Sequence, residues 1–128
     1  MSPLRRRRER LADDALVVVR GGVLSEADLA RDALRTFRRF GEYGVSVLAA
    51  PTPGDLDQLE RTVLRRFETV TVMMAGTIRS AGLELVPTFR SPHYTVLLPE
   101  LQADAERLAR CDNELQRNPH FRPDEVQT

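Results

Sequence analysis

Short apolar runs alternate with capped amphipathic segments along most of the chain, and this alternation limits the fold more than any other feature. Residues 15–19 read Ala-Leu-Val-Val-Val, a continuous run typical of a strand buried on both faces, and Gly21 and Gly22 follow it. Residues 45–49 and 70–74 are two further apolar runs of strand length. We therefore expect strands at these three places, with helices between them.

The first intervening segment carries the signals of a helix. Ser25 is suited to cap its N-terminus, and Asp28, three residues later, can complete a capping box. Apolar residues recur at helical spacing as far as Phe40, and Gly41 is suited to end the helix. These features predict an amphipathic helix that packs one face against a sheet.

The second intervening segment begins with Thr52 as the capping residue and Pro53 at the first helical position, where proline is well tolerated. Asp57 and Arg61 are spaced to form an i,i+4 ion pair on its surface. Its expected buried stripe comprises Leu56, Leu59, Val63 and Phe67.

The last part of the chain predicts a hairpin and a helix. Residues 83–89 and 93–98 are extended segments on either side of Arg90-Ser91-Pro92, which favours a β-hairpin with a three-residue connection. Residues 77–81 before it are long enough for one helical turn. A final helix from Pro99 would direct four apolar side chains inward: Leu101, Ala105, Leu108 and Leu115.

A chain of 128 residues fits one domain. We predict an α+β (mixed α/β) fold, in which β-α-β-α-β is followed by the hairpin and the C-terminal helix around a mixed sheet of about five strands. The two βα units favour parallel pairing with right-handed crossovers. Residues 1–14 are expected to form a flexible arginine-rich arm, residues 15–117 the domain, and residues 118–128 a frayed tail.

The composition excludes several classes of protein. The formal net charge is zero, so nucleic acid or an acidic membrane could be met only by a local patch. No apolar run approaches the roughly 20 residues that span a bilayer, so no membrane is expected. The single cysteine, Cys111, cannot form an internal disulfide, and the first residues do not read as a secretory leader. We therefore expect a cytoplasmic protein. Phosphate-loop, zinc-ligand and nucleophile-elbow motifs are absent, so no metal and no cofactor is expected.

One hairpin brings together three residue types that a ribonuclease uses. Such an enzyme needs a group that titrates near neutral pH to move the 2′-hydroxyl proton, and a cation to bind the phosphate. Arg90, His93 and Tyr94 lie within this hairpin and form the candidate catalytic set. The structural alternative is that strand alternation directs Tyr94 inward and leaves His93 as an ordinary edge-strand residue.

A second candidate set lies where two predicted strands adjoin. Arg20 ends the first strand, and Tyr43 and Ser46 start the second. If the two strands are neighbours, a guanidinium, a phenol and a hydroxyl come together and form a substrate-binding site for an anion or a nucleotide. Arg20 could equally be a solvated strand end. The arm, with Arg5 to Arg8 and Arg10, could follow phosphates or lie on an acidic partner protein.

Several segments resemble known groups of proteins. Residues 16–22, residues 43–47, and Pro87-Thr88-Phe89 with residues 92–96 are similar to a group of small uncharacterised proteins of actinobacteria, a resemblance that extends from Ala15 to Leu98. Small proteins of this kind resemble components of two-gene toxin and antitoxin cassettes. The resemblance implies an antitoxin-like protein as a partner.

Two toxin families are similar to shorter parts of the chain. Residues 81–94 resemble the messenger-RNA interferases with a double-stranded-RNA-binding-like fold, which implies a catalytic role for His93. The strand that ends at Arg20, with residues 44–50 and a helix carrying Glu60, resembles toxins of the ADP-ribosyltransferase class, which implies NAD bound by Arg20 with Glu60 or Glu100 near the ribose. Three functions stay open: an enzyme acting on RNA, a non-catalytic protein-interaction module, and an NAD-dependent ADP-ribosyltransferase.

Overall fold

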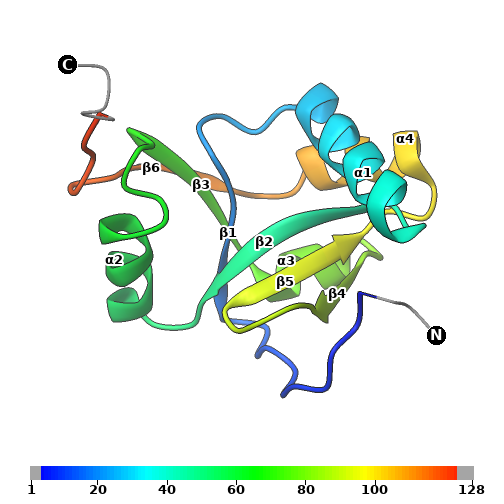
Figure 1. Ribbon diagram of the computed structural model, residues 1–128, viewed down its shortest axis with the longest axis horizontal. Helices are drawn as coiled ribbons and strands as arrows, with labels where there is room; N and C mark the ends of the chain where they lie inside the picture. Colours follow the sequence, from blue (N-terminus) through cyan, green and yellow to red (C-terminus); the bar gives the residue numbers. More distant parts are fainter. Residues whose placement is uncertain (1–3, 124–128) are drawn as a thin grey trace.

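A computed structural model describes residues 4–123, which form one α+β unit built on a single sheet (Figure 1). The described residues contain six strands and four helices. In chain order the elements are β1 (Leu16–Gly21), α1 (Glu26–Phe40), β2 (Gly44–Ala50), α2 (Pro53–Arg61), β3 (Thr69–Met74), α3 (Ala75–Ser80), β4 (Glu84–Pro87), β5 (His93–Leu97), α4 (Leu101–Ala109) and β6 (Glu114–Arg117). The predicted class, the first three strands, the short helix before the hairpin and the hairpin are confirmed, but the connection between the hairpin strands comprises residues 88–92 and not the predicted three residues.

The sheet has the strand order β4-β5-β2-β1-β3-β6, and every neighbouring pair is antiparallel. The prediction of parallel pairing is therefore wrong, although β2 and β3, which lie on either side of β1 and are both antiparallel to it, run in the same direction. α1 connects β1 to its antiparallel neighbour β2, so the chain runs back along β1 after the helix. Pairing between β1 and β2 reaches only from Leu16↔Ala50 to Val18↔Leu48, and the first residues of β2 pair with β5 instead.

The sixth strand is a second correction. The last helix begins at Leu101 and ends at Ala109, and residues 114–117 pair with β3 as β6. Leu115, predicted to point inward from that helix, lies on this edge strand and is 49% exposed. Asp112 and Asn113 explain the break, because short polar side chains compete for backbone hydrogen bonds and favour turns over helix interiors.

The two faces of the sheet bury separate apolar clusters. Side chains of α1, α3 and α4 pack with Val17 and Val19 on one face, and those of α2 pack with Val18 on the other, which confirms that the first strand is buried on both sides (Figure 1). Within the predicted stripe of α2, Leu56 and Leu59 are buried and Phe67 packs partly buried against the same cluster. Val63 is 60% exposed, contrary to prediction, because α2 ends at Arg61.

Local capping signals explain where the helices begin and end. The Ser25 side chain accepts a hydrogen bond from the Asp28 backbone, and Gly41 ends α1 with φ at 79°. Thr52 and Asp55 form a complete capping box at α2, with Pro53 in its first turn. The Asp28 carboxylate, which was predicted to complete a capping box at α1, forms ion pairs with Arg20 at 3.4 Å and Arg31 at 2.8 Å.

The arm and the tail both contact the domain. Leu4 is buried, Arg5 forms an isolated bridge with Thr88, and the Arg6 backbone donates to the Pro87 carbonyl at 2.8 Å. At the other end of the sheet, the buried Asn118 amide donates to carbonyls of the α2 segment at 3.0 and 3.1 Å. The flexibility of residues 1–14 and the fraying of residues 118–128 stay predictions, and residues 1–3 and 124–128 lie outside the described part.

No helix between residues 4 and 123 has the length and apolar character needed to cross a membrane.

Candidate functional site

The arginine-rich arm and the β4–β5 hairpin form one continuous surface. Arg8 donates hydrogen bonds to the carbonyls of Phe89 at 3.0 Å and Thr88 at 3.2 Å, and also to the carbonyl of His93. Its guanidinium lies over the Tyr94 ring, 5.1 Å from the centroid. Because one side chain contacts both β5 and the connection between the strands, it fixes the arm at the bend.

A groove opens between this arm, β4 and α3, with a volume of about 660 Å³. Its lining includes five arginines, and we call it the arginine groove: Arg5, Arg6, Arg8, Arg10 and Arg79. Residues far apart in the sequence thus supply guanidiniums to one surface. Because the net charge of the chain is zero, a polyanion could bind only at a local basic patch, and the arginine groove is such a patch.

Two carboxylates compensate part of this charge. Arg5 pairs with Glu84 at 2.5 Å, and Asp13 lies 2.7 Å from Arg79 and 3.8 Å from Arg10. Apart from Arg79, whose side chain is 18% exposed, the members of these pairs are largely exposed, and such pairs contribute little to stability. The lining therefore keeps an excess of positive charge.

An exposed aromatic residue stands at the bend. Phe89 is 41% exposed and has a φ of 50°, a left-handed conformation that is uncommon for a bulky side chain. Its ring packs edge-on against His93, at 4.8 Å between centroids, and is tilted against Phe40 at 5.5 Å. A strained aromatic residue held by its neighbours is typical of a binding site rather than of a core.

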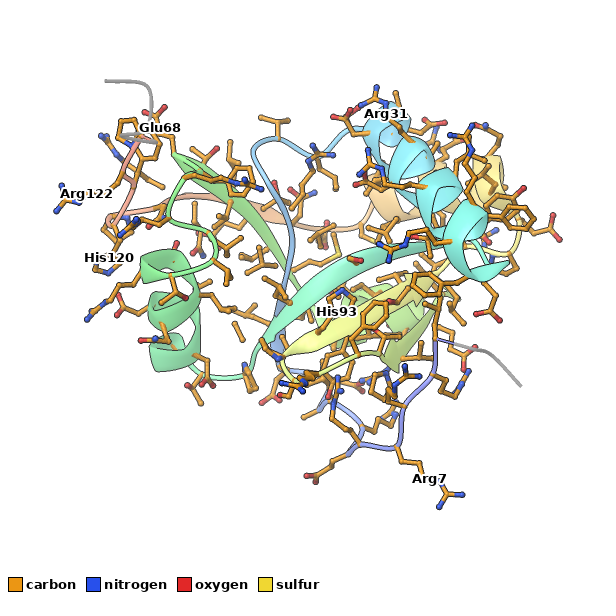
Figure 2. All side chains as sticks on the ribbon, in the orientation of Figure 1. Arg7, Arg31, Glu68, His93, His120 and Arg122 are labelled. Carbon is orange, nitrogen blue, oxygen red and sulfur yellow. The ribbon has the colours of Figure 1, made fainter. Side chains whose placement is uncertain are left out.

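The structure does not bring the predicted catalytic residues to one face. Tyr94 belongs to the larger apolar cluster, and its hydroxyl donates to the Glu9 carbonyl at 3.2 Å. His93 is next to it in β5 and therefore points to the opposite face, where its Nδ1 lies 2.6 Å from the Thr88 hydroxyl (Figure 2). Arg90 is exposed in the connection between the strands.

The environment of His93 favours its neutral form. Burial lowers the pKa of the imidazole, and the Arg8 guanidinium nearby lowers that pKa further. A neutral imidazole at physiological pH can accept a proton or a hydrogen bond.

The second predicted set is also dispersed. Arg20 lies 3.4 Å from Asp28, Tyr43 stacks on Phe37 with centroids 4.4 Å apart, and Ser46 faces a cleft beside α1. The pairing register accounts for this, because β1 leaves β2 after Val18 and Arg20 pairs only with β3. A shared anion site of these three residues does not form in this arrangement.

The two acidic residues implied by the ADP-ribosyltransferase resemblance lie in other parts of the fold from Arg20. Glu60 is buried on α2 beneath the C-terminal segment, and burial raises the pKa of its carboxyl. His120 of that segment lies 2.7 Å from Asp57, one turn earlier on α2 (Figure 2). Glu100 lines a different pocket, together with Tyr43.

Sequence reasoning missed Arg79 and the arginines on one side of α1. Arg79 enters the groove only because α3 packs beside β4, an arrangement that the local sequence does not signal. Arg35 and Arg39 face the same cleft as Ser46, and their i,i+4 spacing was a usable signal. Among residues 4–123, no group of three or more potential ligands (His, Cys, Asp or Glu) could hold a metal ion.

Comparisons with protein-family models, with curated proteins and with solved structures gave no match for this chain. The resemblances to actinobacterial proteins and to toxins stay predictions, and the function must be argued from the surface itself.

Proposed function

We propose that the protein binds the phosphate backbone of single-stranded nucleic acid in the arginine groove, with RNA as the predicted strand. The observation that carries the proposal is the attachment of the arm to the hairpin by Arg8, which gathers five guanidiniums around one groove. Guanidiniums bind phosphate oxygens in paired, charge-assisted hydrogen bonds. A basic groove of this kind is the usual track for a nucleic-acid backbone.

The aromatic residue at the bend supports a single strand over a duplex. Phe89 offers an exposed ring at the bend, outside the lining of the groove, and its carbonyl is bound by Arg8. Unpaired bases stack on such rings, whereas the bases of a duplex are already stacked on each other. Phosphates in the groove and a base on Phe89 would then belong to the same strand.

An acidic protein partner fits this surface less well. Peptides often bind by adding a strand to a free sheet edge, but the arm already covers part of β4, through the Arg5–Thr88 bridge and the Arg6–Pro87 hydrogen bond. Among the apolar residues of the groove, Leu83, Leu85 and Val86 are buried and offer no anchor pocket for a leucine or aromatic side chain.

The proposal is binding and not cleavage, because Arg90, His93 and Tyr94 do not face a common groove. Strand alternation separates the two ring-bearing residues, and the phenol is already hydrogen-bonded within the fold. An RNA cleavage assay therefore tests a separate prediction.

Fluorescence anisotropy with labelled single strands of about 12 nucleotides, within the range of known binding sites, tests the proposal. The double variant Arg6→Gln/Arg10→Gln removes two exposed groove charges, and Arg110→Gln/Arg117→Gln removes two exposed charges outside the groove, at the C-cap of α4 and in β6. We expect the groove variant to bind at least tenfold more weakly than the control variant. RNA, DNA and a polyglutamate peptide serve as parallel ligands; equal affinity of both variants for every strand, or preference for the peptide, would contradict the proposal.

A further inference from the structure

A second cleft lies beside α1, on the face of the sheet that carries Ser46. It has a volume of about 260 Å³, and we call it the α1 cleft. Its lining includes Phe89, whose carbonyl is bound by Arg8 of the arginine groove. The two cavities therefore meet at the bend of the hairpin.

One stripe of α1 forms the wall of this cleft. Asp32, Arg35, Thr36, Arg39 and Phe40 all line it, and their spacing of i, i+3, i+4, i+7 and i+8 places them on one side of the helix. The opposite side of the helix buries other residues in the core. The stripe thus presents two guanidiniums to a cleft rather than to the core.

The sheet supplies a floor of hydroxyl groups. Ser46 of β2 and Thr95 of β5 are direct partners in the register, so both side chains lie on the same face. Gly44 is a further residue of that face, and a side chain there would come within 2.5 Å of the Thr95 methyl group. Gly44 lies in β2, where its missing side chain makes room for Thr95.

A chain of hydrogen bonds links this floor to His93. The Thr88 hydroxyl lies 2.6 Å from His93 Nδ1 and 2.9 Å from the Thr95 hydroxyl, and both threonines are buried. When Nδ1 carries the proton it donates to Thr88, Thr88 donates to Thr95, and the Thr95 hydrogen is left to donate into the cleft. When Nδ1 is unprotonated the donors point the other way, and Thr95 offers only lone pairs.

We propose that the α1 cleft binds a nucleoside monophosphate unit, either as a free mononucleotide or as the phosphorylated end of a strand. Arg35 and Arg39 bind the phosphate, and Thr95 donates to it through the chain that starts at His93. The Asp32 carboxylate accepts from a ribose hydroxyl, and the base lies on Phe89. A cleft of this size lies just below the range typical of small-molecule sites and suits one nucleotide rather than two.

The strand-end form rests on the proposed function of the arginine groove, whereas binding of a free mononucleotide does not. Isothermal titration with uridine 5′-monophosphate and with uridine tests the free form. We expect the monophosphate to bind and uridine to bind at least tenfold more weakly, because charge-assisted hydrogen bonds to phosphate supply most of the affinity.

Matched variants locate the site. Arg35→Gln/Arg39→Gln should weaken binding of the monophosphate by about tenfold for each guanidinium removed, whereas Arg38→Gln, an exposed arginine on the same helix but outside the lining, should not change it. Thr95→Val keeps the shape of the side chain and removes the hydroxyl. It should weaken binding of the monophosphate and leave binding of uridine unchanged.

The histidine gives an independent readout. Nitrogen NMR of His93 should show Nδ1 protonated when uridine monophosphate is bound, and Thr95→Val should remove this response.

Arg6→Gln/Arg10→Gln should leave monophosphate affinity unchanged, so failure of the groove and failure of the cleft are distinguishable. Equal affinity for uridine and its monophosphate, or equal effects of the Arg35/Arg39 and Arg38 variants, would overturn the proposal. For the strand end, RNA with a 5′-phosphate should bind more tightly than RNA with a 5′-hydroxyl, and equal affinity would limit the cleft to free mononucleotides.

Discussion

The guanidinium of Arg8 donates a hydrogen bond of 3.0 Å to the carbonyl of Phe89, a residue 81 positions later in the chain. This hydrogen bond links the N-terminal arm to the bend of the β4–β5 hairpin, beside the Arg5–Thr88 bridge and the Arg6–Pro87 hydrogen bond. The arm supplies charge, the bend supplies an aromatic ring, and neither lies near the other in the sequence.

Replacing Arg8 should damage both stability and binding. Arg8→Gln removes donors to three carbonyls, so we expect a loss of about 1–3 kcal/mol in the free energy of unfolding, measured with urea. Arg7→Gln is the control, because Arg7 is exposed and points away from the domain (Figure 2). Equal stability of the two variants would mean that the arm is not held by Arg8.

Substitutions of Phe89 should affect the stability of the protein and its affinity for RNA differently. Phe89→Gly relieves the positive φ that Phe89→Ala retains, so the glycine variant should be more stable than the alanine variant by about 1 kcal/mol. Both should bind single-stranded RNA more weakly, by about 1–3 kcal/mol, because a base no longer has the ring to stack on. Chemical unfolding and anisotropy measure the two effects. Wild-type affinity in both variants would remove Phe89 from the binding surface.

Stability should fall at mildly acidic pH because of His93. Its pKa is lowered in the fold, so the unfolded chain binds more protons once the pH drops below the ordinary value of 6.5. The stability present above this pH is then lost as the pH falls toward the lowered pKa. His93→Asn should flatten this part of the curve of unfolding free energy against pH. An unchanged slope in the variant would show that His93 is not the titrating group.

Glu60 should act in the opposite direction. Its pKa is raised above 4.5 by burial, and one carboxylate oxygen lacks a hydrogen-bond partner, so the folded chain holds a proton that the unfolded chain has released. Stability should therefore decrease as the pH rises through the window that starts at 4.5. Glu60→Gln should stabilise the protein by about 1 kcal/mol at pH 7 and have less effect at pH 4. A variant that is destabilised at pH 7 would indicate a charged role for Glu60.

The predicted ribonuclease chemistry has its own test. Because the three hairpin residues do not converge, we expect wild-type protein and His93→Ala to leave a labelled RNA equally intact in a gel-based cleavage assay. Cleavage by the wild type that His93→Ala abolishes would restore the catalytic prediction, with His93 acting apart from Tyr94.

The features of the fold that could be predicted from the sequence are those set by local interactions. Ser25, Gly41 and Thr52 each act on the few residues beside them, so their helix ends followed from the sequence alone. The direction of β2 did not, because it depends on pairing with β1 and β5, which lie far from it in the sequence. Leu115 was misassigned for a related reason, since pairing with β3 decides its conformation.

The candidate site shows the same division. The arm and the hairpin were each recognised as sites of interest, but their union depends on hydrogen bonds between residues about 80 positions apart. Arg20, Tyr43 and Ser46 were grouped on the assumption that adjoining strands align along their whole length. The register separates them and leaves Ser46 with Arg35 and Arg39 of α1.

The most direct test of the arginine groove is the salt dependence of RNA binding. A plot of log affinity against log salt concentration has a slope of about −0.7 for each phosphate that a protein neutralises on a single strand. Arg6→Gln/Arg10→Gln should make this slope shallower by about 1.4 relative to the wild type, whereas Arg110→Gln/Arg117→Gln should keep the wild-type slope. Identical slopes for all three proteins would show that the strand does not bind in the groove.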